Sequence, residues 1–329
     1  MRSVLLRWLC PILVLLLLFW GSLFLYYPLN ISANDALYTL FTNAHNSIAS
    51  ITVNNLRVPR SICAMLIGAS LSLAGALLQS ITRNPLASPS LLGINSGAAL
   101  AMVIATAFNP ALLSSYSISF VAALGGGLSW LLVISISAGW RTNVERSRIV
   151  LAGIAVSMLC AALTKLTLIL SEDNAYGIMN WLAGGVGHIR WEAVKILLPF
   201  TLPAIIISMI MANKLNILSL SDETATSLGI NLFQLRIIVN LCALFLIGST
   251  VSIAGPFAFI GLLVPHIARY WIGHDLRKSL PMSIIFGAIL MLIADTLARA
   301  ITFPNELPAG AILALIGAPF FVWLARGKQ

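Results

Sequence analysis

A few charged residues stand at the ends of long apolar segments, where they could take part in binding. Arg57 and Arg60 come directly before one such segment, and Asp295 and Arg299 lie near the end of another. Asp295 and Arg299 are four positions apart and share one face of a helix. The three arginines are candidates for a docking surface, and a guanidinium group is suited to one because it can form two parallel hydrogen bonds with a carboxylate. Contact with lipid headgroups, or a local pair between Asp295 and Arg299, is the alternative.

A short polar helix within segment 214–232 is the second candidate site. A serine suits its N-cap, and two acidic residues follow in the first turn, where negative charge complements the helix dipole. A Leu-Gly pair ends the helix, since glycine is favoured at a helix C-terminus. A docking helix for a partner protein and an ordinary solvated loop helix both explain this pattern. The residues concerned are Ser221, Asp222, Glu223, Leu228 and Gly229.

Lys165 lies inside an apolar segment, where a charge is costly unless it faces a water-filled cavity or reaches the membrane surface. It is therefore a candidate for lining a pathway. Milder polar residues in such segments serve equally well as hydrogen-bond partners between helices. These residues are Gln79, Asn95, Asn180 and Asn240.

Motifs of enzymatic chemistry are absent from the sequence. It contains no phosphate-binding loop of the form G-x-x-x-x-G-K-[ST] and no H-E-x-x-H motif, and it contains no nucleophile elbow. The four histidines and four cysteines are scattered, and no C-x-x-C pair occurs. We therefore expect no catalytic residue, no metal site and no cofactor. If transport through this chain uses ATP, the ATPase is another protein.

The elements that position these residues must lie in a membrane, because the chain is 59% apolar and only 9% charged. Soluble proteins carry about 25% charged residues. The apolar residues form ten runs close to the length that a spanning helix needs, about 20 residues. We predict a single all-α transmembrane domain over residues 1–329, with helices at 5–27, 59–82, 91–108, 117–138, 147–170, 193–213, 233–254, 256–273, 280–301 and 308–325.

The charge distribution predicts the orientation of these helices. With both chain ends in the cytoplasm and alternating spans, most of the 19 Lys and Arg residues fall on the cytoplasmic side, as the positive-inside rule requires. The net charge of +9 then reflects orientation rather than nucleic-acid binding. The first run is too long for a cleaved signal peptide, so we expect a retained helix. Segment 214–232 lies inside in this arrangement, and Arg57, Arg60 and Arg299 lie outside.

An internal repeat is indicated when the chain is shifted by 180 positions. Repeat one would cover about 59–170 and repeat two about 233–325. Five helices separate the matched segments, so the two repeats would have opposite orientation, as in many transporters. The matched positions are Gly68–Gly75 with Gly248–Gly255, Pro85 with Pro265, and Gly93 with Gly273.

Seven segments form longer motifs, namely Leu56–Arg60, Gly68–Gly75, Asn84–Gly93, Gly255–Arg269, Asp295–Arg299, Glu306–Gly310 and Gly317–Leu324. In type and order they resemble the motifs of the permease family of iron-siderophore and vitamin B12 importers. The resemblance extends over essentially the whole chain from about residue 10. Within that family, Ser88–Met102 and Glu172–Trp191 are most similar to the branch that imports ferric citrate.

The resemblance implies a fold of ten helices and an assembly with several partners. Two permease subunits pair around a central pathway, two ATP-binding subunits lie below them, and a periplasmic binding protein delivers the cargo. In the ferric citrate system the two permeases are different chains, which implies a heterodimer. The resemblance also implies a multi-pass protein of the bacterial inner membrane that transports an iron(III) chelate, ferric citrate in particular.

The resemblance further assigns roles to residues. In the family a cytoplasmic coupling loop contacts the ATPase, the fifth and tenth helices line the pathway, an inner gate precedes the fifth helix, and arginines meet glutamates of the binding protein. The coupling loop corresponds here to 218–229, and the two pathway helices correspond to 147–170 and 308–325. The inner gate corresponds to Glu145, Arg146 and Ser147. The arginines that meet the binding protein correspond to Arg57, Arg60 and Arg299.

Alternatives to this function remain open from the sequence. Another siderophore, haem or vitamin B12 is an alternative cargo, because ferric citrate is anionic and Lys165 is the only basic candidate within a central helix. An ion-coupled secondary transporter would need buried carboxylates, which the apolar runs almost lack. A membrane enzyme or scaffold would need a catalytic cluster or a soluble domain.

Overall fold

The computed structural model describes residues 2–26, 31–42, 48–90, 92–108, 115–137, 146–171 and 175–326, and within these ranges it is helical and contains no strand. Each of the ten predicted runs overlaps one helix of 13 or more residues. These are α1 (Arg2–Phe24), α4 (Val58–Thr82), α5 (Ile94–Phe108), α6 (Ser115–Ile136), α7 (Arg146–Leu170), α9 (Trp191–Leu218), α11 (Leu232–Ala254), α12 (Ile260–Ile272), α13 (Leu276–Ile301) and α14 (Ala309–Arg326).

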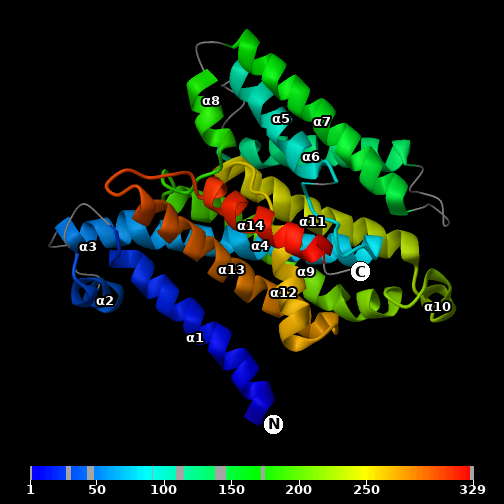
Figure 1. The fold of residues 1–329 in the computed structure, drawn as a ribbon, viewed down its shortest axis with the longest axis horizontal. Helices are drawn as coiled ribbons and strands as arrows, with labels where there is room; N and C mark the ends of the chain where they lie inside the picture. The colour runs from blue at the N-terminus through cyan, green and yellow to red at the C-terminus, as the bar shows by residue number, and fades with distance from the viewer. Residues whose placement is uncertain are drawn as a thin grey trace.

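Shorter helices connect the long ones. They are α2 (Ala33–Thr42), α3 (Ile48–Thr52), a π-helical turn η1 (Val53–Arg57), α8 (Ala175–Leu182) and α10 (Asp222–Ser227). Figure 1 shows α3 near one end of α4 and α10 near the other. The residues that lead into α4 and the segment 214–232 therefore lie at opposite ends of the central helix.

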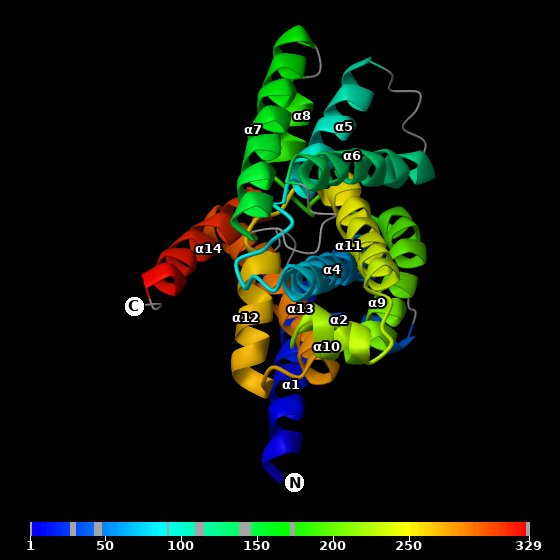
Figure 2. The ribbon, with the colours of Figure 1, turned by 90° about the vertical axis from the view of Figure 1, so that its right-hand side faces the viewer.

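Helix α4 forms the centre of the molecule and is buried over most of its length. It packs against α9, α11, α12 and α13, which surround it in the view of Figure 2. Helices α5, α6 and α7 form a second group that stands to one side, with α8 beside them (Figure 1). Helix α11 joins the two groups because it contacts α4 as well as α5 and α6.

Pairs of glycines allow α4 to approach its neighbours closely. A Cβ atom placed on Gly68 would overlap the carbonyl oxygen of Gly287 in α13, and one placed on Gly75 would overlap that of Gly261 in α12. In a membrane the hydrophobic effect gives little drive for helix association, so close backbone packing supplies much of the energy. The glycine-rich motif of α4 therefore decides which helices contact it.

The eighth predicted run is only partly helical, which corrects the prediction of a spanning helix at 256–273. Residues 255–258 have no regular secondary structure, and α12 has 13 residues, about 20 Å at 1.5 Å per residue, against about 30 Å for a bilayer core. Gly255 ends α11 with φ +78°, and Pro256 follows. Irregular backbone at membrane depth needs partners within the protein. Here Asn95 Nδ2 donates to Phe257 O at 3.3 Å, and Gln79 Nε2 donates to Gly261 O at 3.2 Å.

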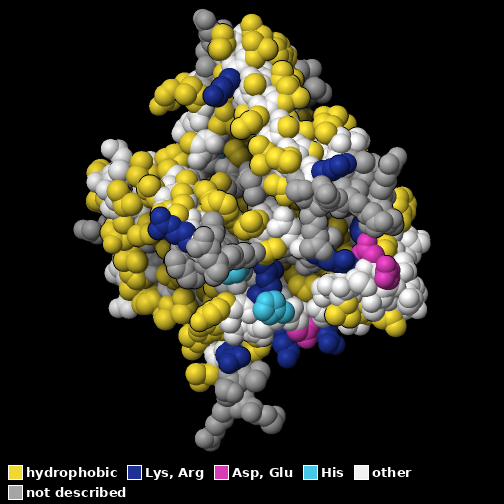
Figure 3. Space-filling view, turned by 45° about the vertical axis from the view of Figure 1, so that its right-hand side comes forward, with side chains coloured by type: hydrophobic (Ala, Val, Ile, Leu, Met, Phe, Trp, Pro, Cys, Tyr) yellow, Lys and Arg dark blue, Asp and Glu magenta, His cyan; other side chains and the backbone are white. Residues whose placement is uncertain are grey.

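The exposed surface suits a lipid environment. Among the described residues, six helices are long and apolar enough to cross a membrane, and three further apolar helices are shorter. Hydrophobic side chains cover much of the face in Figure 3, where the acidic side chains lie only at the right and lower edges, beside basic ones. The predicted class of fold, an all-α membrane protein, is confirmed.

Two glycines that the predicted repeat matches, Gly68 and Gly248, each lie at a close helix contact. Gly68 of α4 meets Gly287 of α13, and Gly248 of α11 meets Ala123 of α6. The fixed shift of 180 positions does not continue further, however, because Pro85 lies in the link before α5, whereas Pro265 lies inside α12. The links within the two halves differ in length. The repeat as a whole stays a prediction.

Candidate functional site

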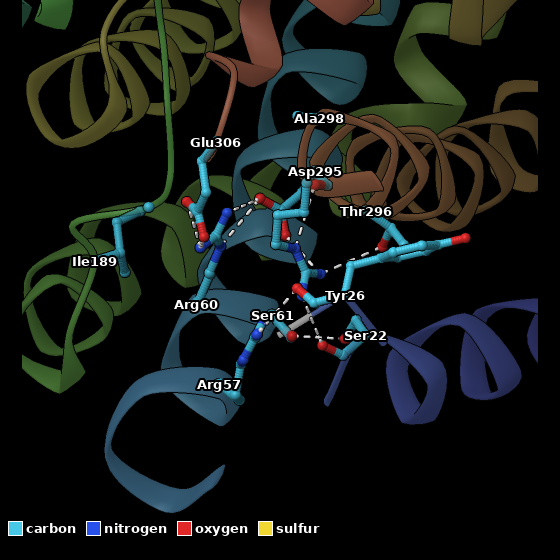
Figure 4. Close-up of polar contacts among 12 residues, drawn as sticks. Ser22, Tyr26, Arg57, Arg60, Ser61, Ile189, Asp295, Thr296, Ala298 and Glu306 are labelled. Atoms are coloured by element: carbon cyan, nitrogen blue, oxygen red, sulfur yellow. Dashed lines mark hydrogen bonds and ion pairs between the residues drawn. The ribbon is translucent and has the colours of Figure 1, made fainter. Parts of the chain in front are cut away.

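Arg57, Arg60, Asp295 and Glu306, from distant parts of the chain, lie together at one end of α4 (Figure 4), and Arg299 joins them through Asp295. Arg57 comes from η1, Arg60 from the first turn of α4, Asp295 and Arg299 from the last turns of α13, and Glu306 from the link to α14. We call these five residues the arginine cluster. The sequence predicted its arginines as a group, and the structure brings them together.

Arg60 is the centre of the arginine cluster. Its Nε and Nη2 atoms donate to Asp295 Oδ1 at 3.0 and 2.7 Å, and its Nη1 atom donates to both carboxylate oxygens of Glu306 at 2.9 Å. One guanidinium group therefore joins two helices and a link, through acids that are 235 and 246 residues away in sequence. Glu306 was visible only as part of a motif, and nothing in the sequence identified it as the partner of Arg60.

Arg299 secures the end of α1. Its Nη2 atom lies 3.1 Å from Asp295 Oδ2, and its Nη1 atom donates to the carbonyl oxygens of Ser22 and Leu25 at 3.2 and 3.1 Å. The last carbonyl groups of a helix lack partners within the helix and attract positive charge. Arg57 acts at the same place through a bond of 3.5 Å to Tyr26 O.

All three arginines are buried in this conformation. Their exposed fractions are 2% for Arg57, 7% for Arg60 and 1% for Arg299. The local pair between Arg299 and Asp295, which the sequence offered as an alternative, is present in the structure. The predicted contact with a carboxylate-bearing protein stays a prediction, and it requires the arginine cluster to open.

The predicted helix in segment 214–232 lies at the other end of α4 and is confirmed in detail. Ser221 is its N-cap, with Oγ accepting from Thr224 N at 2.9 Å. The helix, α10, begins at Asp222 and ends before Leu228 and Gly229. Gly229 has φ +78° with open space around it, a backbone conformation that glycine adopts without strain.

Asp222 joins α10 to two long helices. Its Oδ1 accepts from Arg83 Nη2, and its Oδ2 accepts from Arg236 Nη2 at 2.8 Å. Arg83 ends α4 and also donates from Nε to Leu218 O at 2.8 Å. We call Arg83, Asp222 and Arg236 the Asp222 clamp. The sequence did not identify these two arginines as partners of Asp222, because Arg83 is 139 residues away and Arg236 lies on the next helix.

The surface of α10 is apolar at its two ends. Leu220, Leu228 and, at the start of α11, Phe233 are exposed, while Ala225 is buried against the body of the protein. Glu223 is exposed as well. Exposed apolar residues beside a charged turn are typical of a surface that a partner covers.

Asp275 supports the same end of the molecule between α12 and α13. Asn216 Nδ2 donates to its Oδ1 at 2.7 Å, and the backbone N–H of Arg277 donates to it at 3.0 Å. These hydrogen bonds stabilise the charged form, with that from Asn216 the strongest, and they lower the pKa of Asp275. Asp275 thus caps α13 and holds the C-terminal part of α9.

The predicted pathway residues are described only in part. Lys165 is exposed on α7, on the helix face that also carries the exposed Met158 and Ile169. Glu145 lies outside the described residues, and the side chains of Arg146 and Ser147 are not described either. The gate predicted from these three residues therefore stays a prediction.

A cavity of about 430 Å³ was not predicted. It lies between the end of α5, α8, the start of α9 and the end of α11. Its polar lining includes Thr106, Trp181, His188, Arg190 and Glu192. His188 Nε2 lies 3.1 Å from Ile253 O, so this ring has a partner within the protein. Among the described residues, no group of three His, Cys, Asp or Glu side chains could hold a metal ion.

Comparison with known proteins agrees with this architecture. The profile of the FecCD transport family matches residues 13–327. The chain belongs to the FecCD transport family. Its ten long helices and the motif residues at both ends of α4 lie almost entirely within the matched region.

The relatives are permeases of iron transport systems. The chain is 55% identical to the Fe(3+) dicitrate transport system permease protein FecC of Escherichia coli (strain K12), over 98% of this chain and 97% of that protein. It is 40% identical to the Fe(3+)-citrate import system permease protein YfmD of Bacillus subtilis (strain 168), over 90% and 87%. It is 38% identical to the Fe(3+) dicitrate transport system permease protein FecD of Escherichia coli (strain K12), over 82% and 83%.

A solved structure shows the same fold. It is described as an inward-facing conformation of a metal-chelate type ABC transporter, and it matches 97% of this chain and 98% of its own with a TM-score of 0.82 at 29% identity. This member of the family therefore has the fold of a metal-chelate permease from end to end.

Proposed function

We propose that this chain is the membrane-spanning permease subunit of an ATP-driven importer for iron(III) citrate. The observation that carries the proposal is the identity of 55% to FecC over 98% of the chain. The similarity includes both ends of α4 and the whole of α10, and the fold matches that of a metal-chelate transporter. The sequence contains no phosphate-binding loop, so a separate chain is proposed to hydrolyse the ATP.

The partners follow from this proposal. A second permease chain, similar to FecD, is proposed to pair with this one across α7 and α14, which both expose apolar residues, among them Leu151, Ile169 and Leu315. Two ATP-binding subunits contact α10, and a periplasmic binding protein contacts the opposite end. The pathway then runs beside α7, with Lys165 as its basic group and Glu145, Arg146 and Ser147 at the inner gate.

The cargo is tested by uptake of radioiron-labelled citrate in a strain that lacks this gene and its relatives. Cells that express the chain with its partners should accumulate iron from citrate and not from haem or a hydroxamate siderophore. Uptake should stop when ATP is depleted and persist when only the proton gradient is dissipated. Uptake of haem instead, or loss with the proton gradient alone, would contradict the proposal.

The contact of α10 with the ATPase is tested by Leu228→Glu, with Gly229 left intact. The leucine lies at the end of α10 and is exposed, so the permease should still insert into the membrane. Co-purification of the ATP-binding subunit should be lost, together with uptake. Normal co-purification in this variant removes the assigned role of α10.

The contact with the binding protein is tested at the arginine cluster. Arg57→Glu reverses the charge of the one arginine in the cluster that comes from η1 and donates to Tyr26 O. Losing one partner of a desolvated interfacial pair costs about 2–5 kcal/mol, so binding of the purified binding protein should weaken strongly. ATPase binding should stay normal. Unchanged affinity would leave the arginines with an internal role only.

The orientation of the chain is tested with reporter fusions. The chain is proposed to lie in the inner membrane with both ends in the cytoplasm. A fluorescent protein fused after residue 326 should therefore fold and fluoresce. Alkaline phosphatase inserted after residue 31 should be active in the periplasm. The opposite pattern of reporter activity would reverse the assignment of the two ends of α4.

A further inference from the structure

The chain connects α10 to only two of the long helices. Residues 219–221 lead from α9 into α10, and residues 228–231 lead from α10 into α11. A displacement of α10 therefore reaches these two helices through the backbone. The central helix α4 ends beside Arg83, 139 residues before Asp222, and only contacts between side chains and backbone can transmit such a displacement to it.

Arg83 makes this contact from the C-terminal end of α4. It adopts a left-handed conformation with φ 47° and ψ 33°, which is uncommon for a residue with a side chain. Its backbone N–H donates to Gln79 O and so completes the last turn of α4. Its guanidinium group then contacts Leu218 O at the end of α9 and Asp222 at the start of α10. The left-handed residue thus directs its side chain from α4 toward α10.

Asp222 uses one oxygen atom for each neighbouring helix. Oδ1 holds the arginine of α4, and Oδ2 holds that of α11. At the N-terminus of α10 this carboxylate is also favoured by the helix dipole. The only residue of α10 buried against the body of the protein is Ala225, so the clamp is the main polar attachment of this helix.

The burial of the clamp is intermediate. The side chains of Arg83, Asp222 and Arg236 are 21%, 25% and 30% exposed. A pair at this depth keeps part of its attraction, which water weakens, and avoids most of the desolvation cost of a dry pair. The arginines can therefore follow the carboxylate as it moves.

We propose that Asp222 is a positioning residue that couples α10 to α4. When the ATP-binding subunit displaces α10, the Asp222 clamp moves the end of α4, and with it α12 and α13, which pack closely on α4 at Gly75 and Gly68. This inference rests on the proposed contact of α10 with the ATPase. Loss of Asp222 separates hydrolysis from transport without removing the ATPase.

The two arms of the clamp distinguish coupling from a merely structural role. The arm to Arg236 duplicates a backbone connection, because α11 follows α10 directly in the chain. The arm to Arg83 has no such duplicate. Coupling therefore requires Arg83→Gln to lower the ratio of uptake to ATP hydrolysis more than Arg236→Gln does, with the ATP-binding subunit retained in both variants.

The experiment uses the complete complex reconstituted in proteoliposomes with its ATP-binding subunits, second permease and binding protein. Uptake of radioiron citrate is divided by the ATP hydrolysed. In Asp222→Asn this ratio should fall about tenfold, within the range of about 5–150-fold that coupling between two sites commonly produces. Co-purification of the ATP-binding subunit should be unchanged. Asp222→Glu should recover part of the ratio.

The matched control is Asp275→Asn. It removes an ion-paired carboxylate at the same end of the molecule, and it should leave the ratio of uptake to hydrolysis unchanged. If Asp222→Asn and Asp275→Asn give the same ratio of uptake to ATP hydrolysis, the proposal is overturned. It is also overturned if Arg83→Gln and Arg236→Gln lower this ratio equally. If Asp222→Asn fails to fold, the comparison of the two arginine variants decides.

The contact with the ATPase is separated from the coupling by Leu228→Glu. If that variant keeps the ATP-binding subunit, the proposed role of α10 fails, whatever Asp222 does. If Leu228→Glu loses the subunit while Asp222→Asn also loses it, Asp222 is a docking contact and the coupling proposal is wrong. Retention in Asp222→Asn with loss of coupled uptake supports the proposal.

Discussion

The arginine cluster and the Asp222 clamp hold opposite ends of α4 with the same chemical groups, and they differ in burial. Asp295 and Arg299 have side chains that are 1% exposed, whereas those of the clamp are 21–30% exposed. A buried charge that loses its partner cannot be solvated, while a partly exposed carboxylate can exchange an arginine for water. We infer that the cluster locks α1, α4 and α13 together, and that the clamp can form and break.

The largest expected effect is at Asp295. Asp295→Ala leaves Arg60 and Arg299 buried without their shared carboxylate, which should lower the free energy of unfolding by about 3–5 kcal/mol. Denaturant unfolding of the purified permease in detergent micelles measures this. The double variant Asp295→Ala with Arg299→Leu, which removes one uncompensated charge, should recover part of the loss. A loss below about 1 kcal/mol, the value for an exposed pair, would remove the distinction drawn from burial.

A smaller effect is expected at the accessible edge of the same cluster. Glu306 is 40% exposed as a side chain, and Arg60 keeps Asp295 when Glu306 changes. Glu306→Gln should therefore cost about 1–2 kcal/mol, between a neutral hydrogen bond and one to a charged group. The same unfolding measurement checks it. A cost as large as that of Asp295→Ala would show that the two acids are equivalent despite their different exposure.

The clamp should contribute little to stability. Asp222→Asn is expected to change the free energy of unfolding by about 0–1 kcal/mol, as for other partly exposed ion pairs, and the difference should shrink at high salt, because ions screen it. Unfolding at two salt concentrations, with Asp295→Ala as the comparison, tests this. If Asp222→Asn proves as destabilising as Asp295→Ala and insensitive to salt, the clamp is a second lock rather than a movable contact.

The smallest effect concerns acid pH. Because hydrogen bonds from Asn216 and Arg277 lower the pKa of Asp275 in the folded protein, the charged carboxylate adds stability above the pKa of the unfolded chain, about 3.9. That contribution is lost as the pH falls through the lower folded value. Asp275→Asn retains an N-cap oxygen and should remove only this pH dependence. If the wild-type chain and Asp275→Asn give identical acid unfolding curves, the charged Asp275 carboxylate does not contribute to stability as predicted.

The local elements of the fold were predictable from the sequence. Helix α10 formed as expected because its signals, the serine N-cap, the acidic first turn and the glycine stop, act within a few residues of one another. The ten apolar runs became helices because an exposed backbone polar group is too costly in lipid. The eighth run was wrong in part, since composition did not show that the irregular backbone at Phe257 finds a partner on α5.

Contacts between distant segments were decided only by the tertiary structure. The sequence singled out Arg57, Arg60 and Arg299, but it did not show that Arg60 lies between Asp295 and Glu306 or that Arg83 reaches Asp222. For a charged side chain near a helix end, the sequence offers several oppositely charged residues that could equally well form the ion pair. The choice among them depends on which helices can approach α4, and glycine contacts such as Gly68 with Gly287 settle that in three dimensions.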